Sequence, residues 1–282
     1  MSRVHGAGDA LAHNARAHDQ VADVYDGKHV EIYNPIEQAR LRETVAQLVT
    51  LCGKPRPDAL DMGAGTGNLA MKLLAAGCNV SAADVSPRSL ERLAAKAPPG
   101  TKIETRLITG RSLPFEDASF DIVGTYSVLH HVPDYVFAVS EMARVLRPGG
   151  WLYIDHEACP GAWKVDPVLG QYRHATRLTP AAHLAQLARS GELFSYAFAK
   201  TVFMKLFVDR RYEREGDIHV WPDDHIEWDR IEGALAQAGV AMERSRDYLV
   251  YRPRGGEALF NQYRDRCADT RYVFARKAAK ES

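Results

Sequence analysis

Apolar and polar positions between residues 58 and 158 change repeatedly from a period of two to a period near 3.6. Strand-like runs occur at ALDMG (59–63), NVSAAD (79–84), KIETRLI (102–108), FDIVGTYSV (120–128) and WLYID (151–155). Helical patterns follow the first, second and fourth of these runs. This alternation predicts a parallel sheet with helices on both faces and a ligand at the carboxyl ends of its strands.

Capping residues mark the expected helix ends. Ser86 followed by Pro87 predicts a helix start, and Asp134 predicts another before YVFAVSEMARVL (135–146). Gly77 and Gly239 suit the position just after a helix. The second of these ends the amphipathic helix EWDRIEGALAQAG, and two further strands are expected at 240–251 and 270–278, as a hairpin with a long connection.

Two segments lie outside this repeating pattern. Residues 14–50 look helical, interrupted by YNP at 33–35, and GKPRP at 53–57 separates them from the first strand. Residues 160–218 lose the regular pattern, although Thr179-Pro180 starts one helix and the aromatic-rich stretch 194–212 predicts another. This second segment is either an insertion over the carboxyl edge of the sheet or a helical layer without ligand contact.

Composition limits the classes of function. The 282 residues carry 36 Lys plus Arg and 36 Asp plus Glu, so a chain-wide basic surface for non-specific nucleic-acid binding is not expected. No apolar run is long enough for a membrane span, and the first 20 residues contain no secretory apolar region. Four widely spaced cysteines without a CxxC pair favour a cytoplasmic protein with reduced thiols over a disulfide framework or a zinc site: Cys52, Cys78, Cys159 and Cys267.

A glycine turn at DALDMGAGTGNLAMKLLAAG (58–77) predicts a close backbone approach to a ligand. A dinucleotide fingerprint would be GxGxxG, but Asn68 stands at the position of its third glycine. Asp84 ends the second strand at a distance suited to ribose hydroxyls, which a dinucleotide and other nucleosides share. It could also be a charge at the start of the next helix.

Five segments occur in a familiar order: LDMGAGTGNLA, AADVSPRSLERLAAKA, LPFEDASFDIV, SVLHHVPD and RVLRPGGWLYID. Together they resemble class I S-adenosylmethionine-dependent methyltransferases of the small-molecule type 11 group, which is similar to ubiquinone and menaquinone biosynthesis enzymes. The resemblance covers residues 56–158 and, more weakly, 225–278. It implies an α/β Rossmann-like fold with a seven-stranded, mostly parallel sheet, an antiparallel last strand, helices on both faces and a helical lid insertion.

This resemblance implies a division of the chain and a set of cofactor contacts. A lid segment (1–55) would precede the core (56–158), and an insertion (159–218) would precede the rest of the core (219–282). S-adenosylmethionine would be the cofactor, with its ribose on Asp84. The other implied contacts are Asp61, Gly63, Ala64, Gly65 and Gly67 for the amino-acid part, Val85, Thr109, Gly110 and Arg111 for the adenine, and Tyr126 beside the cofactor. Thr109 replaces an Asp that is frequent in the family.

His131 and His130 are the candidates for a general base, since an imidazole titrates near neutrality. The alternative is that one packs in the core and the other shapes the pocket. Asp155, His156 and Glu157 follow the fifth strand and raise the possibility of a metal site, as in catechol-type enzymes. We favour no metal, with Glu157 orienting the substrate instead.

Other candidates lie near the pocket's expected mouth. In HVWPDDHIEW (219–228), the acidic residues suit a helix start better than a metal site. His225 is a candidate for the pocket wall. Tyr25 and Tyr33 in the N-terminal segment, and Phe198 and Phe203 in the insertion, are candidates for a lid over the cofactor. A plain surface helix is the alternative for the N-terminal segment.

The sequence therefore predicts methyl transfer from S-adenosylmethionine to a small molecule, and we favour oxygen as the acceptor atom. Methylation of nitrogen or carbon, a non-catalytic binding protein and a dehydrogenase remain alternatives. Methylation of a tRNA base also remains open because basic residues occur in the insertion: Arg173, Arg177, Lys200, Lys205, Arg210 and Arg211. The expected binding partner is a small-molecule substrate, and binding to nucleic acid or to a membrane is not expected. The chain is expected to be a monomer or a homodimer.

Overall fold

The computed structural model describes residues 13–19, 22–23, 25–164, 166–177, 188, 202–203, 206–207 and 225–279. Within these ranges, seven strands form a single sheet in the order β3-β2-β1-β4-β5-β7-β6. The strands are β1 (Asp58–Met62), β2 (Asn79–Asp84), β3 (Glu104–Leu107), β4 (Phe120–Tyr126), β5 (Leu146–Ala158), β6 (Val240–Tyr248) and β7 (Thr270–Lys277). The predicted α/β architecture is confirmed.

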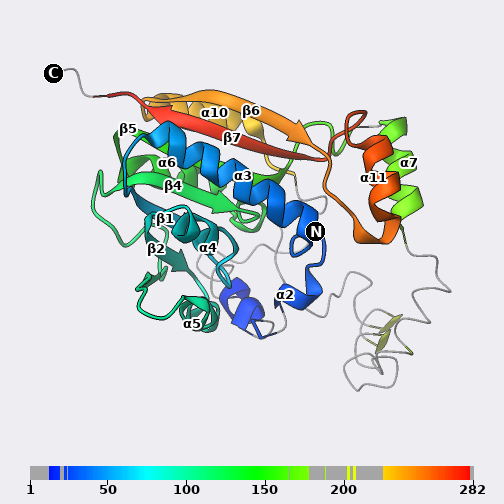
Figure 1. The fold of residues 1–282 in the computed structure, drawn as a ribbon, viewed down its shortest axis with the longest axis horizontal. Coiled ribbons are helices and arrows are strands. Elements are labelled where there is room, and N and C mark those ends of the chain that lie inside the picture. The colour runs from blue at the N-terminus through cyan, green and yellow to red at the C-terminus, as the bar shows by residue number, and fades with distance from the viewer. Residues whose placement is uncertain are drawn as a thin grey trace.

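The pairing directions also agree with the prediction. Strands β1 to β5 pair in parallel, whereas β7 runs antiparallel to both β5 and β6. The last strand in the chain thus lies between β5 and β6 (Figure 1). The parallel strands β1 to β5 all end at one edge of the sheet, which is the edge where ligands bind in folds of this kind.

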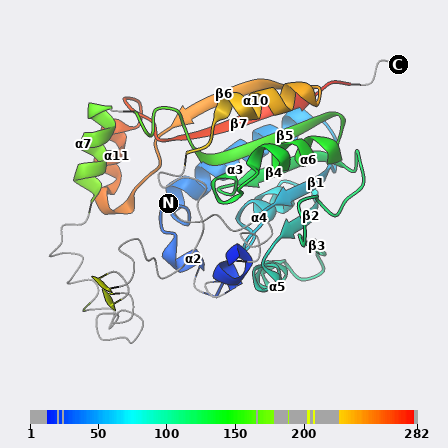
Figure 2. The same ribbon diagram turned by 180° about the vertical axis from the view of Figure 1, so that it is seen from behind.

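Helices cover both faces of the sheet (Figures 1 and 2). Helices α3 (Pro35–Cys52), α4 (Asn68–Ala75) and α5 (Pro87–Lys96) lie on one face, and α6 (Tyr135–Val145) and α10 (Trp228–Gln237) lie on the other. Each face has its own apolar core. One contains Leu41, Leu73 and Phe274, and the other contains Met142 and Ile231. Burial of these two faces is the main favourable contribution to folding.

The helix starts follow from local hydrogen bonds. The Asn34 side chain accepts from the Glu37 amide at the start of α3, and the Ser86 and Asp134 side chains cap α5 and α6 in the same way. The YNP sequence therefore marks the start of a helix. It is preceded by a helical stretch at 13–19 and the short helix α2 (Tyr25–Lys28).

The fifth strand is longer than predicted. It begins at Leu146, because Leu146 pairs with Phe120 before a bulge in the ladder, and Gly149 takes a φ of 78° within it. The Lys277 ammonium donates to the carbonyls of Ala143 and Leu146 and ties this start to β7. Apolar periodicity could not reveal this part of the strand, since Arg147-Pro148-Gly149-Gly150 has no strand pattern.

Part of the segment predicted as an insertion is described. Helix α7 (Pro167–Thr176) packs against α11 (Gly256–Tyr263) and a short helical turn, η3 (Pro253–Gly255), at the end of β6 and β7 (Figure 1). The helix expected after Thr179-Pro180 and most of the predicted aromatic helix lie outside the described residues. Among the helices that the structure describes, none is both long and apolar enough to cross a membrane.

Candidate functional site

The loop between β1 and α4 has a backbone that requires glycine. Gly63, Gly65 and Gly67 have φ angles of 72°, 50° and 96°. A Cβ atom on Gly63 would lie 2.5 Å from a methyl of Val128, and one on Gly67 would lie 2.9 Å from Leu93. Nothing lies within 4 Å of a Cβ on Gly65. The loop is therefore closely packed at its two ends and open in the middle.

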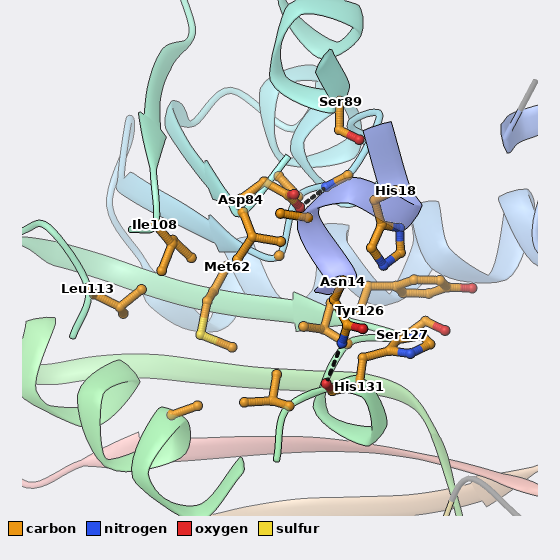
Figure 3. A pocket seen from close by; sticks show the side chains of 18 of the residues that line it. Asn14, His18, Met62, Asp84, Ser89, Ile108, Leu113, Tyr126, Ser127 and His131 are labelled. Atoms are coloured by element: carbon orange, nitrogen blue, oxygen red, sulfur yellow. Dashed lines mark hydrogen bonds between the residues drawn. The ribbon is translucent and has the colours of Figure 1, made fainter. Parts of the chain in front are cut away.

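Asp84, at the end of β2, faces the open part of this loop. Its carboxylate accepts from the amide of Gly65 at 2.7 Å and from the amide of Ser86 at 2.8 Å (Figure 3). Burial raises the pKa of Asp84, and the two backbone hydrogen bonds and the charge of His18 oppose that rise. The carboxylate retains further lone pairs, so it can accept from a ligand hydroxyl as well.

Asp61 lies beneath the start of α4. One carboxylate oxygen accepts from the Ala70 amide at 2.8 Å, and the other has no hydrogen-bond partner among the described residues. Burial raises the pKa of Asp61 to about 7, and the charge of Asp84 adds to the rise. Asp61 does not line the cavity that opens over the carboxyl edge of the sheet.

A cavity of about 520 Å³ opens over the carboxyl edge of the sheet. One end is apolar and is bounded by Met62, Ile108 and Leu113 (Figure 3). This end also receives several of the residues expected around an adenine: Val85, Thr109, Gly110 and Arg111. The Arg111 guanidinium pairs with Asp134 and lies over the Phe137 ring, so its charge is already compensated at the rim.

The other end of the cavity carries hydrogen-bonding groups. His131 and Ser127 come from the loop after β4, and Asn14 and His18 come from the N-terminal segment (Figure 3). Tyr126 lies between them, and its ring stacks on His156 with the centroids 4.9 Å apart. The cavity therefore has an apolar end and a polar end, and Asp84 and the glycine loop lie between them.

Glu157 holds the loop that bears the two predicted histidines. One carboxylate oxygen accepts from the amides of Val128 and Leu129 at 2.8 and 2.7 Å, and the other lies 2.8 Å from Nδ1 of His130. Glu157 and His130 are buried and lie behind the loop, whereas His131 lines the cavity. The geometry therefore favours His131 over His130 as a group that meets a substrate, and Glu157 acts through the loop.

The backbone is unusual where β4 and β5 end. Ser127 and His156 have φ angles of 59° and 61°, a region that side chains other than glycine adopt rarely. His156 lies in a bulge of β5 opposite β7, which turns its side chain onto Tyr126. Burial lowers the pKa of His156. Its imidazole is therefore neutral at pH 7.

The side chains after β5 turn in different directions. The buried Asp155 carboxylate accepts from Arg40, Tyr153 and Tyr248, which tie it to α3 and β6. Glu157 points instead to the loop after β4. Within the part of the chain that the structure describes, no group of three His, Cys, Asp or Glu side chains is arranged to hold a metal ion.

The lid candidates are placed unequally. Tyr25 and Tyr33 line the cavity, and the Tyr33 hydroxyl lies 3.1 Å from the Thr66 hydroxyl in the glycine loop. Phe203 is 56% exposed and stacks with Phe207, and Phe198 lies outside the described residues. His225 packs against Trp163 and is not part of the cavity wall. The role of each remains a prediction.

Sequence reasoning missed Ser127 at the polar end. It also missed two residues there from the N-terminal segment, Asn14 and His18. They stand four positions apart in a helical stretch, and this spacing puts both on one face. The spacing could have shown that Asn14 and His18 share one face of a helix. Nothing in the sequence pattern indicated that this helix face would contact the loop after β4.

Comparisons with known proteins agree with this geometry. Residues 60–154 match the family model of a methyltransferase domain. The 27-O-demethylrifamycin SV methyltransferase of Amycolatopsis mediterranei is 35% identical over 117 residues, 40% of this chain and 42% of that protein. A ubiquinone biosynthesis O-methyltransferase of Methylocella silvestris is 35% identical over 133 residues, 43% of this chain and 51% of that protein. The chain thus spans only about half the length of these curated relatives.

Solved structures share the fold at low sequence identity. A putative sarcosine dimethylglycine methyltransferase from Galdieria sulphuraria has a TM-score of 0.53 at 17% identity, covering 85% of this chain and 86% of that chain. Magnesium protoporphyrin IX methyltransferase from Synechocystis, with bound S-adenosylhomocysteine, has a TM-score of 0.52 at 17% identity and covers 93% of this chain and 100% of that chain. These likenesses concern the fold alone.

Proposed function

We propose that the chain, whose residues 60–154 match the family model of a methyltransferase domain, uses S-adenosylmethionine to methylate a hydroxyl group of a small molecule. Three parts of the cavity support the proposal: the glycine loop, the carboxylate of Asp84, and the imidazole of His131. All three open onto one continuous space, so a nucleoside cofactor and an acceptor can lie beside each other in it.

The residues present fit the cofactor. Gly65 has open space where a side chain would lie, which leaves room for the amino-acid part against the loop. Asp84 can accept from both ribose hydroxyls, and the apolar end with Ile108 and Leu113 suits an adenine ring. Thr109 and Gly110 border that end, in support of a weaker adenine contact than a carboxylate would give.

The presence of His131 in the same space as Asp84 carries the proposal of catalysis. When bound, S-adenosylmethionine supplies an electrophilic methyl on a positively charged sulfur. An attacking hydroxyl must lose its proton, and His131 is the residue we propose to accept it. The loop that holds His131 is fixed by Glu157 and by Asn14, whose amide donates to the His131 carbonyl at 3.1 Å. Alignment is the protein's main contribution to a displacement of this kind.

We propose an uncharged, partly apolar acceptor. The polar end offers amide, hydroxyl, phenol and imidazole groups, and the charged residues of the wall already have partners: Asp84, Arg111, Asp134 and Glu141. The equal counts of acidic and basic residues support a small molecule over a nucleic acid. The similarity to O-methyltransferases, such as that of ubiquinone biosynthesis, supports the choice of a hydroxyl.

The direct test uses purified protein and S-adenosylmethionine with a labelled methyl group. A panel of phenols, enols, amines and carboxylic acids, followed by a metabolite extract, should give labelled methyl ethers. Calorimetry with S-adenosylhomocysteine should show binding at one site. Labelled amines or carbon-methylated products would change the acceptor atom. Binding of S-adenosylhomocysteine without transfer to any acceptor would favour a non-catalytic binding protein.

A further inference from the structure

The helical stretch 13–19 crosses the polar end of the cavity and is anchored on both sides. At one end, the Asn14 side chain donates to the carbonyl of His131. At the other end, the Asp19 carboxylate accepts from the Ser86 hydroxyl at 2.6 Å and from the Arg88 amide at 3.2 Å. Asp19 therefore sits at the start of α5, where exposed amides favour a negative charge.

The same side of the segment continues as a row of ion pairs with α5. Asp23 pairs with Arg88 and Arg92, and Asp26 pairs with Lys96. We call Asp19, Asp23 and Asp26 the acidic clasp. Because the basic residues of α5 are spaced by four positions, they lie on one face of that helix and match the row of acids. The clasp fixes where residues 13–19 lie.

His18 is held between these anchors. It immediately precedes Asp19, lines the cavity and meets the His131 ring edge-on at 5.8 Å between centroids (Figure 3). The Tyr25 ring of α2 lies 6.4 Å from the His18 ring between centroids. One imidazole thus comes from the loop after β4 and the other from a segment outside the sheet.

We propose that His18 is a second imidazole at the methyl-transfer end of the cavity, where it holds the acceptor hydroxyl together with His131 and is positioned by Asp19. This rests on the proposed function. Two imidazoles offer an acceptor and a donor to one hydroxyl, since each neutral ring carries both. The preferred substrate is therefore a weakly acidic hydroxyl, as in a phenol or an enol.

Charge gives this placement a measurable consequence. Within the described ranges, the titratable and charged groups that face His18 include His131, Tyr25 and the carboxylate of Asp84. An imidazolium at the transfer end repels the positive sulfur of S-adenosylmethionine but not the neutral sulfur of S-adenosylhomocysteine. For two like charges within about 10 Å of each other at an effective dielectric constant of about 20, such a repulsion lowers the affinity about tenfold or more. The preference for S-adenosylmethionine over S-adenosylhomocysteine should therefore be smaller in mildly acidic than in mildly alkaline buffer.

The experiment measures the affinities for both compounds by calorimetry at about pH 5.5 and about pH 8, because imidazole side chains in general change charge within this interval. In the wild type, the ratio of the affinity for S-adenosylmethionine to that for S-adenosylhomocysteine should differ by about tenfold or more between the two pH values. His18→Gln and His131→Gln should each remove part of that change. His174→Gln on α7, an exposed histidine, is the matched control and should keep it. Resonances of labelled His18 should also differ between the two complexes.

A second pair of variants tests the positioning by Asp19. Asp19→Ala removes the contacts with Ser86 and Arg88 and should reproduce the His18→Gln profile, whereas Asp19→Asn keeps an accepting oxygen and should restore most of the wild-type profile. An unchanged profile in His18→Gln, with normal binding of S-adenosylhomocysteine, would overturn the proposal and leave the proposed function intact. Failure of the wild type to bind either compound would instead refute the proposed function.

Discussion

The carboxylate of Glu157 lies 2.8 Å from Nδ1 of His130, and its other oxygen accepts two consecutive backbone amides of the same loop. A charged group on β5 therefore determines the shape of the loop that follows β4. The two strands are neighbours in the sheet, so this contact lies at the carboxyl edge, directly behind the cavity.

Replacement of this carboxylate should loosen the loop. Glu157→Gln keeps the shape but loses the charge, and we expect the free energy of unfolding to decrease by about 1–3 kcal/mol, since buried amides then lose a strong acceptor. Denaturant titration measures the loss. Glu243→Gln, at an exposed site on β6, is the control and should change little. Equal stability of the two variants would mean that the loop does not depend on Glu157.

Gly63→Ala should disrupt the glycine loop. The new Cβ would lie 2.5 Å from Val128 at a φ of 72°, so either Val128 or the loop must move. Binding of S-adenosylhomocysteine should fall at least tenfold in calorimetry, about 1.4 kcal/mol. Gly233→Ala in α10, where nothing lies within 4 Å of the added Cβ, should leave affinity unchanged. Retained binding in Gly63→Ala would argue against a ligand at this loop.

Asp84→Ala should weaken binding of S-adenosylmethionine and S-adenosylhomocysteine by about 1.5–3 kcal/mol, the value of a charged hydrogen-bond acceptor. Both compounds carry the same ribose, so both should lose affinity equally. Asp229→Asn, an exposed position on α10, serves as the control. If calorimetry showed wild-type affinity of Asp84→Ala for both compounds, Asp84 would not be the residue that binds the ribose.

Asp61 should make stability depend on pH. Burial raises its pKa from 3.8 to about 7 in the folded protein, so the folded state holds a proton that the unfolded chain releases. The stability due to that proton is present below about pH 4 and decreases by about 1.4 kcal/mol per pH unit up to about pH 7. Asp61→Asn should lack this decrease in urea titrations at several pH values, whereas the exposed Asp265→Asn should retain it. Parallel pH profiles of the wild type and Asp61→Asn would contradict the prediction.

The acidic clasp should respond to salt. Its pairs with α5 are largely exposed, and ions screen such pairs within about 10 Å at 0.1 M. Amide exchange in residues 13–19 should therefore be faster at about 0.5 M than at about 0.05 M salt, and Arg92→Gln should reduce the difference. Exchange in β1 is the internal control. Bound S-adenosylhomocysteine should slow amide exchange in residues 13–19. If it does not, these residues do not contact the cofactor.

Local patterns sufficed for most of the fold. The period of the apolar positions predicted β1, β2 and β4 nearly to the residue, and the caps at Ser86 and Asp134 predicted two helix starts. Such signals are local, because a strand or a cap is encoded within a few residues. The start of β5 at Leu146 was missed, since only its pairing partner makes it a strand.

The site was harder to predict because its contacts join distant residues. Asn14 and His131 are 117 positions apart, and no periodicity relates them. Glu157 was predicted to orient a substrate because it stands near the end of a strand, and its side chain contacts the loop after β4 from behind. The order of residues along a strand predicts which edge they reach, but a bulge such as that at His156 decides which way each side chain turns.

The position of β7 also constrains the order of assembly during synthesis. Among the strands that the structure describes, β6 pairs with β7 alone. Strand β6 leaves the ribosome before β7, and β5 receives its second neighbour only when β7 emerges. Until residues 270–277 emerge, β5 has one unpaired edge and β6 has no strand beside it, and unpaired edges are templates for association with other chains. Chains shortened before Thr270 should therefore aggregate even though the glycine loop and Asp84 are intact. The protein depends on its final strand for solubility during synthesis as much as for the completed sheet.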